Sequence, residues 1–430
     1  MQVSSSTSLK IGRRWFVQGI NYLRVRNNIH GVSCNRFINK LTMAKPEETL
    51  NNTMVKVAKK LGYENSQVAI KPTTSNGANY TSVLYNVTLQ APGKEDLHLF
   101  AKVALVGQKM RAADPFKIFD TENLFYTTLI NIYEQLEKKN NVPEEGRLVT
   151  PKFYEGSLEY MKEIMILEDL SAKGFSTFDR LQSITWEFAA KSLENLAKFH
   201  ALSIAFAEDD PQEFKNVVSK LKQGESFDSL QNYIKNVTTT ALKVVKDENR
   251  DRLAKFTDEL QKKEVFENFF QEHRRPFITH RDYRQSNLMY RMVDGKTEVV
   301  AIDYQTVQTG NPIADVMYFI FNGSDKKFRE QYFYKSIEHY YEELCKAFKR
   351  LGLKPEQVYS REDFDYELKK IMPVGLVSSI FCLLVITADK ENVPKVSEDL
   401  VFDDFAIDPN DLYIERINDI VDDFIKMGII

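Results

Sequence analysis

The sequence predicts an α+β fold, in which a sheet-rich N-terminal lobe is followed by a larger, helical C-terminal lobe. Apolar and polar residues alternate over much of the stretch from about Gln67 to Leu170, which is the period of half-buried strands. After Ser171 the apolar residues recur mainly at helical spacing. The 430 residues are 43% hydrophobic and 28% charged, a mixture too apolar for a disordered chain and too charged for a membrane bundle.

Four segments define the predicted N-terminal lobe. Two alternating strands, at 83–89 and 97–105, are separated by the turn signal Pro92-Gly93. Residues 121–136 have helical periodicity, and residues 164–167 form a short apolar strand.

The lobes are predicted to comprise residues 46–170 and 171–430, with a short connection near Glu168–Phe175. In the second lobe, residues 184–206 form an amphipathic helix. The nearly uncharged stretch 371–388 is at the short limit of about 18 residues for a membrane span. Polar residues and a proline dilute it, so we expect a buried core helix and no membrane span.

Residues 1–45 contain eight Lys or Arg and no Asp or Glu. This composition is typical of a mitochondrial presequence. The alternative, which we favour, is an upstream extension of the reading frame with Met43 as a second start. We expect a cytoplasmic protein, or a mitochondrial one if residues 1–42 are translated and act as a presequence.

Composition also limits the partners. The net charge of −3 gives no support to nucleic-acid binding, which needs a basic face. Cys34, Cys345 and Cys382 form neither a disulfide framework nor a zinc pattern, which favours a reducing compartment. The six histidines include no i, i+4 pair, which argues against a histidine-based metal centre. Nothing in the sequence points to an obligate protein partner.

The segment His280–Asn287, followed by Asp303, is the most informative part of the chain. Asp294-Gly295 between two strand-like runs is a strong hairpin signal. The hairpin folds Asn287 back beside Asp303, with Asp282 a few residues upstream, although the register is open by one residue. The alternative is a chance polar loop before a hairpin.

These residue types suit phosphoryl transfer. The Asn287 carbonyl and the Asp303 carboxylate are hard oxygen ligands of the kind that Mg²⁺ takes. Asp282 can orient an attacking hydroxyl and accept its proton. The reaction needs positioning and charge neutralisation more than covalent help.

The chain resembles the insect ecdysteroid kinase-like family, which is related to choline kinase and the aminoglycoside phosphotransferases. The similarity runs from about Leu50 to the C-terminus. It is carried by the catalytic segment above and by further matches to the nucleotide loop (76–85), the lysine strand (100–103), the helix glutamate (122–126), the hinge (167–175) and a C-terminal helix (196–201).

The resemblance implies a bilobal protein-kinase-like fold that binds ATP and Mg²⁺. Lys102, half-buried on its strand, would pair with Glu122 and be held towards the α- and β-phosphates. The loop residues Gly77, Asn79 and Ser82 would contact the phosphates. An ordinary turn before a strand explains this loop nearly as well.

The remaining implied roles concern the hinge and the catalytic segment. The backbone near Glu168, Asp169 and Leu170 would hold the adenine, with the two acidic side chains left in solvent. Asp282 would be the catalytic base, and Asn287 and Asp303 the metal ligands. We expect His280 to brace the catalytic loop, and Asp315 either to cap the helix that it opens or to brace the same loop. We expect His200 to be a core histidine without chemistry.

The chain departs from the family pattern at four positions. Arg281 stands where the family usually has Gly, Arg284 lies near a usual Trp, Ser286 replaces Asn, and Ala78 replaces a frequent Glu. None of these changes removes the base or a metal ligand. They leave substrate preference and catalytic rate open.

Three functions compete. A protein kinase is disfavoured because Asn311-Pro312 and an apolar helix follow soon after Asp303, which leaves little room for a peptide platform. A catalytically silent binding protein usually lacks one of the key residues, and all are present here. We therefore predict a kinase that phosphorylates a hydroxyl of an ecdysteroid or a similar steroid-like or xenobiotic alcohol, with choline or ethanolamine as the alternative acceptor.

Overall fold

The structure is a computed structural model in which residues 45–74, 79–113, 117–221, 227–268 and 274–430 are described. All of them fall within one structural unit. The predicted N-terminal extension, apart from its last residue, lies outside the described residues.

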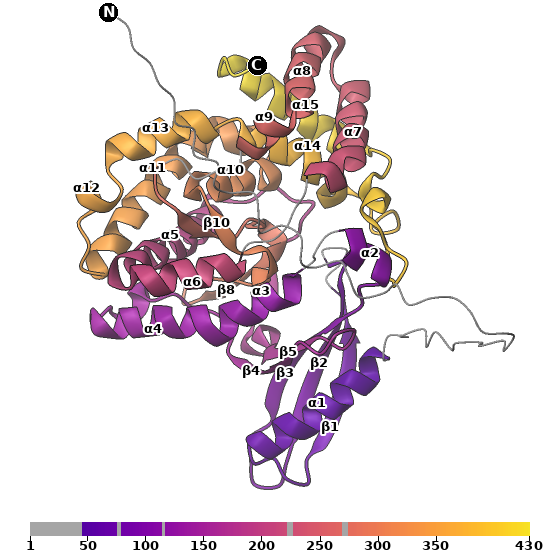
Figure 1. Ribbon diagram of the computed structural model, residues 1–430, viewed down its shortest axis with the longest axis vertical. Helices are drawn as coiled ribbons and strands as arrows, with labels where there is room; N and C mark the ends of the chain where they lie inside the picture. The colour runs from indigo at the N-terminus through magenta and orange to yellow at the C-terminus, as the bar shows by residue number, and fades with distance from the viewer. Residues whose placement is uncertain (1–44, 75–78, 114–116, 222–226, 269–273) are drawn as a thin grey trace, which may run out of the picture. The chain divides into compact units, whose positions relative to one another are not determined.

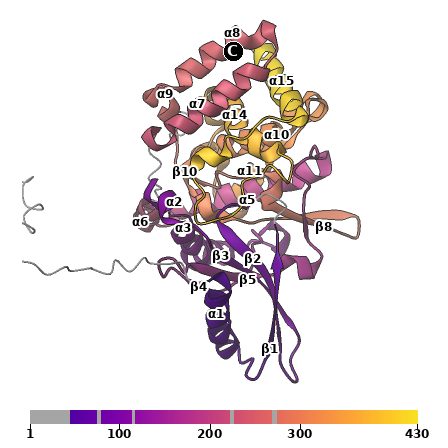
Figure 2. The ribbon, with the colours of Figure 1, turned by 90° about the vertical axis from the view of Figure 1, so that its right-hand side faces the viewer.

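An antiparallel five-stranded sheet forms the N-terminal part, with the strand order β1-β2-β3-β5-β4 (Figures 1 and 2). The strands are β1 (Gln67–Thr73), β2 (Ser82–Gln90), β3 (Leu97–Ala104), β4 (Phe153–Ser157) and β5 (Ile164–Glu168). The two alternating strands predicted from the sequence are β2 and β3, and the short apolar strand is β5.

The alternation of β3 decides which side chains reach which face of the sheet. Leu99 and Ala101 are buried in a core with α1 (Pro46–Lys60), which lies along that face in Figure 1. Because successive side chains of a strand point to opposite faces, Lys102 faces the other way. On that side it meets α3 (Ile118–Leu124).

The other helices of this part are α2 (Gln108–Ala113) and α4 (Ile130–Lys139). A π-helical stretch, Phe125–Leu129, joins α3 to α4. The helix predicted at 121–136 is therefore confirmed as part of a longer helical run. The sequence prediction did not include α1.

Helices dominate the rest of the chain, as predicted. They are α5 (Trp186–Asp209), α6 (Pro211–Leu221), α7 (Phe227–Val244), α8 (Asp247–Leu260), α9 (Lys263–Asn268), α10 (Pro312–Gly323), α11 (Lys326–Arg350), α12 (Pro355–Val358), α13 (Arg361–Ile371), α14 (Val374–Thr387) and α15 (Asp411–Lys426). Short 3₁₀ turns occur at Glu144–Gly146, Leu170–Lys173, Gln285–Asn287, Tyr304–Thr306 and Phe402–Phe405. The α+β fold class is confirmed.

Two small sheets carry the segment with the chemistry. One has the order β6-β8-β9, from Ser176–Thr177, Leu288–Val293 and Lys296–Ala301. The other pairs β7 (Phe277–Thr279) with β10 (Gln308–Gly310). In the hairpin, Leu288 stands opposite Ala301, which settles the register that the sequence left open.

The apolar stretch predicted at 371–388 forms α14, and nearly all of its side chains are buried in the helical core. Among the described residues, no individual helix combines the length and the apolar character that a membrane span requires. The helices α13 and α14, bent by 51° at their junction, meet that requirement only as a pair, by length and composition.

A segment near the C-terminus packs against the N-terminal part. Leu400 is buried in a cluster with Val106 and Met110. At Gly107 a side chain would have no room, because a Cβ there would lie 1.6 Å from the Glu398 carbonyl oxygen. The residues between α14 and α15 are therefore in backbone contact with the end of the lysine strand.

Candidate active site

Lys102 joins two acidic residues at the candidate site. Its Nζ donates to Glu122 Oε2 at 2.7 Å, to Asp303 Oδ1 at 2.5 Å and to Gln305 Oε1 at 3.1 Å. The side chains of Lys102 and Glu122 are only 7% and 2% exposed. The predicted Lys102–Glu122 pair is confirmed, and the structure adds Asp303 to the same ammonium group.

This cluster holds one ammonium group and two carboxyl groups. Burial opposes the charge of Lys102, but Asp303 and Glu122 outweigh it and raise the pKa of Lys102. Burial raises the pKa of Glu122 to about 7, with Lys102 acting against the rise and Asp303 adding to it. Once Glu122 ionises, the cluster carries excess negative charge, which favours a cation bound at Asp303.

The hairpin of β8 and β9 brings Asp303 to the catalytic loop. It turns at Asp294-Gly295, where both residues have the positive φ that such a turn requires. Just beyond its open end, the Ile302 N–H donates to the Asn287 carbonyl oxygen at 2.9 Å. The predicted proximity of Asn287 and Asp303 is therefore confirmed.

An aromatic stack holds the segment that carries Asp303. The Tyr304 ring lies on the Phe125 ring with centroids 3.6 Å apart and planes 11° apart, and both residues are buried. Asp303 has a left-handed φ of 66°, a conformation that costs a non-glycine residue energy. Since Phe125 directly follows α3, the stack ties the helix of Glu122 to the loop of Asp303.

Asp282, the predicted base, has three side-chain partners. The Tyr318 hydroxyl donates to its Oδ1 at 2.8 Å, and Asn287 Nδ2 donates to its Oδ2 at 2.8 Å. Arg284 Nε lies 3.0 Å from Oδ1. Asn287 Nδ2 also donates to the Asp282 carbonyl oxygen at 2.9 Å. Both amide hydrogens of Asn287 thus serve Asp282, and Asn287 Oδ1 is the atom of the amide that a metal ion could take.

Asp315 of α10 braces the start of the catalytic loop, as expected. It accepts hydrogen bonds from the backbone N–H groups of His280 at 2.7 Å and Arg281 at 2.8 Å. Its Oδ2 also lies 3.1 Å from His200 Nε2, and His200 Nδ1 lies 2.7 Å from the Tyr340 hydroxyl. His200 is thus a core histidine with both ring nitrogens partnered, as predicted.

The ionisation of this network suits a structural role. Burial lowers the pKa of His200, although Asp315 acts in the opposite direction. Burial opposes ionisation of Asp315, but the hydrogen bond and charge of His200 outweigh it and lower the pKa of Asp315. His280 Nε2 lies 3.1 Å from the Ile302 carbonyl oxygen, so His280 braces the loop, as predicted.

The predicted nucleotide loop is described only in part. Gly77 lies outside the described residues. Asn79 Nδ2 donates to the Ser82 carbonyl oxygen at 2.5 Å, and Ser82, the first residue of β2, is 1% exposed. Asn79 therefore shapes the entry to β2, and the contact of both residues with phosphates stays a prediction.

The two acidic side chains of the predicted hinge, Glu168 and Asp169, differ from the expectation that they are solvated. Asp169 is 8% exposed. It accepts from Asn86 Nδ2 at 2.7 Å and from the N–H two residues further on at 2.9 Å, which caps the 3₁₀ turn that follows. Glu168 pairs with Lys173. The expectation was wrong because Asn86, on β2, supplies a partner that lies far away in sequence.

The sequence prediction missed an apolar cluster beside the hinge. Leu170, Phe175 and Val300 are buried together, and the partly buried Met289 and Ile302 pack against them. Met289 stands opposite Val300 in the hairpin, so the signal lay in the strand alternation. Such an apolar surface suits a planar base.

Cationic side chains gather near Asp282. The Arg284 side chain is 9% exposed. Burial raises the pKa of Tyr80, while the charges of Arg284 and Arg180 oppose the rise, so Tyr80 lies close to both guanidinium groups. A cavity of about 340 Å³ beside the catalytic loop has Arg180, Ser286 and Lys390 in its wall.

Aromatic residues border the same region. The Tyr233 hydroxyl donates to the Phe381 carbonyl oxygen at 2.5 Å, and the Tyr80 ring meets the Phe405 ring edge-on at 5.0 Å. Burial raises the pKa of Cys382 to about 11; a hydrogen bond with Tyr318 opposes the rise and the charge of Asp282 adds to it. Phe381 and Cys382 therefore place α14 beside the predicted base.

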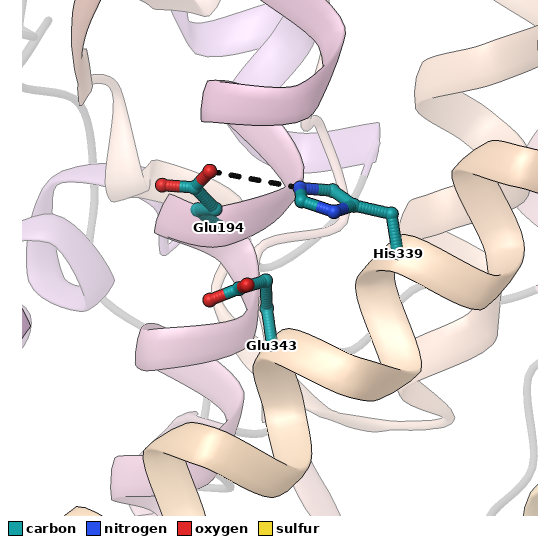
Figure 3. Close-up of side chains that lie close together, drawn as sticks. All are labelled: Glu194, His339 and Glu343. Carbon is teal, nitrogen blue, oxygen red and sulfur yellow. Dashed lines mark ion pairs between the residues drawn. The ribbon is translucent and has the colours of Figure 1, made fainter.

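A second polar cluster lies between α5 and α11, where ligand atoms of Glu194, His339 and Glu343 lie within 4.8 Å of one another (Figure 3). The Glu194 carboxylate, 3.6 Å from His339 Nε2, raises the pKa of His339. Lys191 and Lys346 already pair with the two carboxylates, so the cluster is an ion-pair network on two packed helices. The spacing of histidines gave no signal for it, because it combines one histidine with two glutamates.

Comparison with known proteins places these features in a family. Residues 76–353, well over half of the chain, match the ecdysteroid kinase-like family. No curated protein matches the chain significantly.

Solved structures with a similar fold include an ethanolamine kinase from Plasmodium vivax (12% identity, TM-score 0.44, covering 89% of this chain and 91% of that one). They also include a microcompartment-associated aminopropanol kinase (10% identity, TM-score 0.37, covering 88% of this chain and 98% of that one). A third is an aminoglycoside phosphotransferase from Streptomyces rimosus in complex with ADP and streptomycin (13% identity, TM-score 0.32, covering 75% of this chain and 98% of that one). On the family match, which confirms the resemblance seen in the sequence, the chain belongs to the ecdysteroid kinase-like family.

Proposed function

We propose that this protein transfers the γ-phosphate of ATP to a hydroxyl of an ecdysteroid or a similar uncharged, steroid-like or xenobiotic alcohol. As a member of the ecdysteroid kinase-like family, the chain is a small-molecule phosphotransferase that acts on hydroxyl groups. The proposal adds the nucleotide, the metal ion and the class of acceptor.

One observation carries the proposal: two constellations lie side by side although their residues are distant in sequence. Lys102 donates hydrogen bonds to Glu122 and Asp303, and Asn287 donates a hydrogen bond to Asp282. The Asn287 backbone links the two through its hydrogen bond with the residue before Asp303. A catalytically silent protein has no need for a buried cluster with excess carboxylate.

The residues fit ATP and Mg²⁺. Asn287 Oδ1 and Asp303 are oxygen donors of the kind that Mg²⁺ prefers, and the excess negative charge around Asp303 favours a divalent cation. When bound, Mg²⁺ would neutralise charge on the phosphate oxygens. Lys102, already directed at Asp303, would hold the α- and β-phosphates, and the apolar cluster at Leu170 would contact the adenine.

Asp282 is placed to act as the base. Tyr318 and Asn287 fix the two oxygens of its carboxylate, so it can orient a hydroxyl without reorganising. It would accept the hydroxyl proton as the oxygen attacks the γ-phosphorus in line with the departing ADP. The hydrogen bonds that Asp315 accepts from the backbone of His280 and Arg281 hold the loop that carries Asp282 in place.

The surroundings of Asp282 favour an uncharged acceptor over choline or ethanolamine. Arg284 lies 3.0 Å from the carboxylate, and in the wall of the adjacent cavity the two cations Arg180 and Lys390 outnumber the one acid, Asp179. An ammonium group next to the reacting hydroxyl would meet these like charges. The aromatic rings of Tyr80 and Tyr233 offer an apolar surface instead.

The test uses the purified full chain with ATP, Mg²⁺ and a panel containing an ecdysteroid, plant alcohols, choline and ethanolamine. We expect ADP release and a product heavier by one phosphoryl group with the ecdysteroid or another uncharged ring alcohol. Asp282→Asn should abolish turnover and leave nucleotide affinity nearly unchanged.

Phosphorylation of choline as efficiently as of every uncharged alcohol would overturn the acceptor class. Full turnover in Asp282→Asn would overturn the assignment of the base. A wild-type protein that fails to bind ATP in the presence of Mg²⁺ would overturn the proposal as a whole.

A further inference from the structure

Arg284 is a buried cation within the catalytic loop for which the reaction described above has no role. Its Nε lies 3.0 Å from Asp282 Oδ1, and its side chain is 9% exposed. Placing a guanidinium group in such a site costs desolvation energy. The base does not need it for orientation, because Tyr318 and Asn287 already bond its two carboxylate oxygens.

Charged and polar neighbours stabilise the positive charge of Arg284. Burial is the largest influence and works against that charge, but Asp282, Tyr318, Tyr80 and Asp303 together outweigh it and raise the pKa of Arg284. Two of these neighbours are carboxylates: that of the predicted base, which lies 3.0 Å from Arg284 Nε, and that of the predicted metal ligand Asp303.

In the proposed reaction the acceptor hydroxyl would approach Asp282, and the terminal phosphate would lie near Asn287 and Asp303, the residues that would hold Mg²⁺. Phosphoryl transfer would therefore take place between Asp282 and Asp303. A planar guanidinium group matches the oxygens of a phosphoryl group. In phosphotransferases an arginine placed at the transferred group stabilises the charge of the transition state.

Resting on the proposed phosphotransfer, we propose that Arg284 is a catalytic residue whose guanidinium group binds the transferred phosphoryl group. In the reaction the acceptor oxygen forms a bond to the γ-phosphorus, and its proton passes to Asp282. The bond from the γ-phosphorus to the β,γ-bridging oxygen breaks, and ADP leaves with the electron pair. Arg284 shifts its pairing from Asp282 to the equatorial phosphoryl oxygens, which leaves the carboxylate able to accept the proton.

The experiment separates binding of the transition state from binding of the product. Affinities for ADP and for ADP with aluminium fluoride, both with Mg²⁺, are measured by calorimetry for wild type, Arg284→Gln and Arg284→Lys. Arg250→Gln is the matched control, since Arg250 forms an exposed ion pair with Asp247 within α8. Circular dichroism and thermal melting check that each variant is folded.

We expect Arg284→Gln to keep its ADP affinity within about threefold and to bind the aluminium fluoride complex roughly 10²–10³-fold more weakly. The value of kcat should fall by a similar factor with the best alcohol of the panel, and the KM for ATP should change little. Arg284→Lys should restore part of both losses, because it keeps the charge and loses the planar fork. Arg250→Gln should behave as wild type.

Equal weakening of ADP and of the aluminium fluoride complex in a folded Arg284→Gln protein would overturn the proposal, because it would show a structural role only. Unchanged affinity for the aluminium fluoride complex would overturn it as well. Failure of the proposed function is distinguishable from both results, since the wild-type protein itself would then bind neither ADP nor its complex.

Discussion

Glu122 is the residue whose replacement tests the electrostatics of the site most directly. It is 2% exposed and bonds Lys102, and burial raises its pKa from 4.5 to about 7. Glu122→Gln keeps the shape and the hydrogen-bonding capacity of the side chain and removes its charge. Lys102 keeps Asp303 and Gln305 as partners.

The direction and size of the effect follow from the two pKa values. Below pH 4.5 Glu122 is protonated in both the folded and the unfolded chain. Between pH 4.5 and 7 the unfolded chain loses the proton first, so the stability of the wild type falls as the pH rises. Above pH 7 the full penalty remains, which for a pKa raised to about 7 is about 3 kcal/mol. The variant lacks this penalty.

The assay is urea unfolding of wild type and variant at about pH 5 and about pH 8, on either side of most of the titration. The free energy of unfolding of the variant, minus that of the wild type, should rise by about 2–3 kcal/mol from the lower to the higher pH. Exposed Glu134 on α4 (56% exposed) supplies the control, and Glu134→Gln, a surface substitution, should change the free energy of unfolding by no more than about 0.5 kcal/mol. A flat difference for Glu122→Gln, or one that falls as the pH rises, would refute the reasoning.

Three further outcomes follow from the same geometry. Asp303→Asn removes an anionic ligand and should weaken Mg²⁺–ATP binding in calorimetry, and unchanged metal dependence would count against Asp303 as a ligand. Phe125→Ala removes a fully buried ring from the Tyr304 stack and should lower the free energy of unfolding by about 3–5 kcal/mol in urea titrations, whereas a loss below about 1 kcal/mol would show that the stack is dispensable. Arg281→Gly relieves a left-handed φ of 63° and should raise the melting temperature through a gain of about 0.5–1 kcal/mol, and a lower melting temperature would show that the Arg281 side chain stabilises the fold.

Much of the site could be predicted from the sequence because its residues stand in locally readable patterns. The strand alternation placed Lys102 on the correct face of β3, and the Asp-Gly turn brought Asn287 and Asp303 together. These two inferences needed only a local period and a single turn. The Lys102–Glu122 pair was implied by the family resemblance, with Glu122 near the start of the predicted helix at 121–136.

Other features depend on contacts between segments that no local pattern links. Asp169 was expected in solvent because its partner Asn86 lies 83 residues away on β2. The contact of Tyr318 with Asp282 depends on the packing of α10 against the catalytic loop, which no local pattern predicts. Arg284 stood out in the sequence only as a departure from the family pattern, and its pairing with Asp282 became visible only in three dimensions.

The close approach of Gly107 to Glu398 has a consequence for how the enzyme can be shortened or fused. The segment between α14 and α15 packs, through Glu398 and Leu400, against the residues that follow the lysine strand β3. It lies beyond residue 353, where the family match ends. A protein shortened to the matched region would lack Leu400, so Val106 and Met110 would become more exposed. Any residue larger than glycine at position 107 would displace the backbone at Glu398. The residues between α14 and α15 thus contribute to the packing of the sheet-rich N-terminal part as much as to that of the helical part.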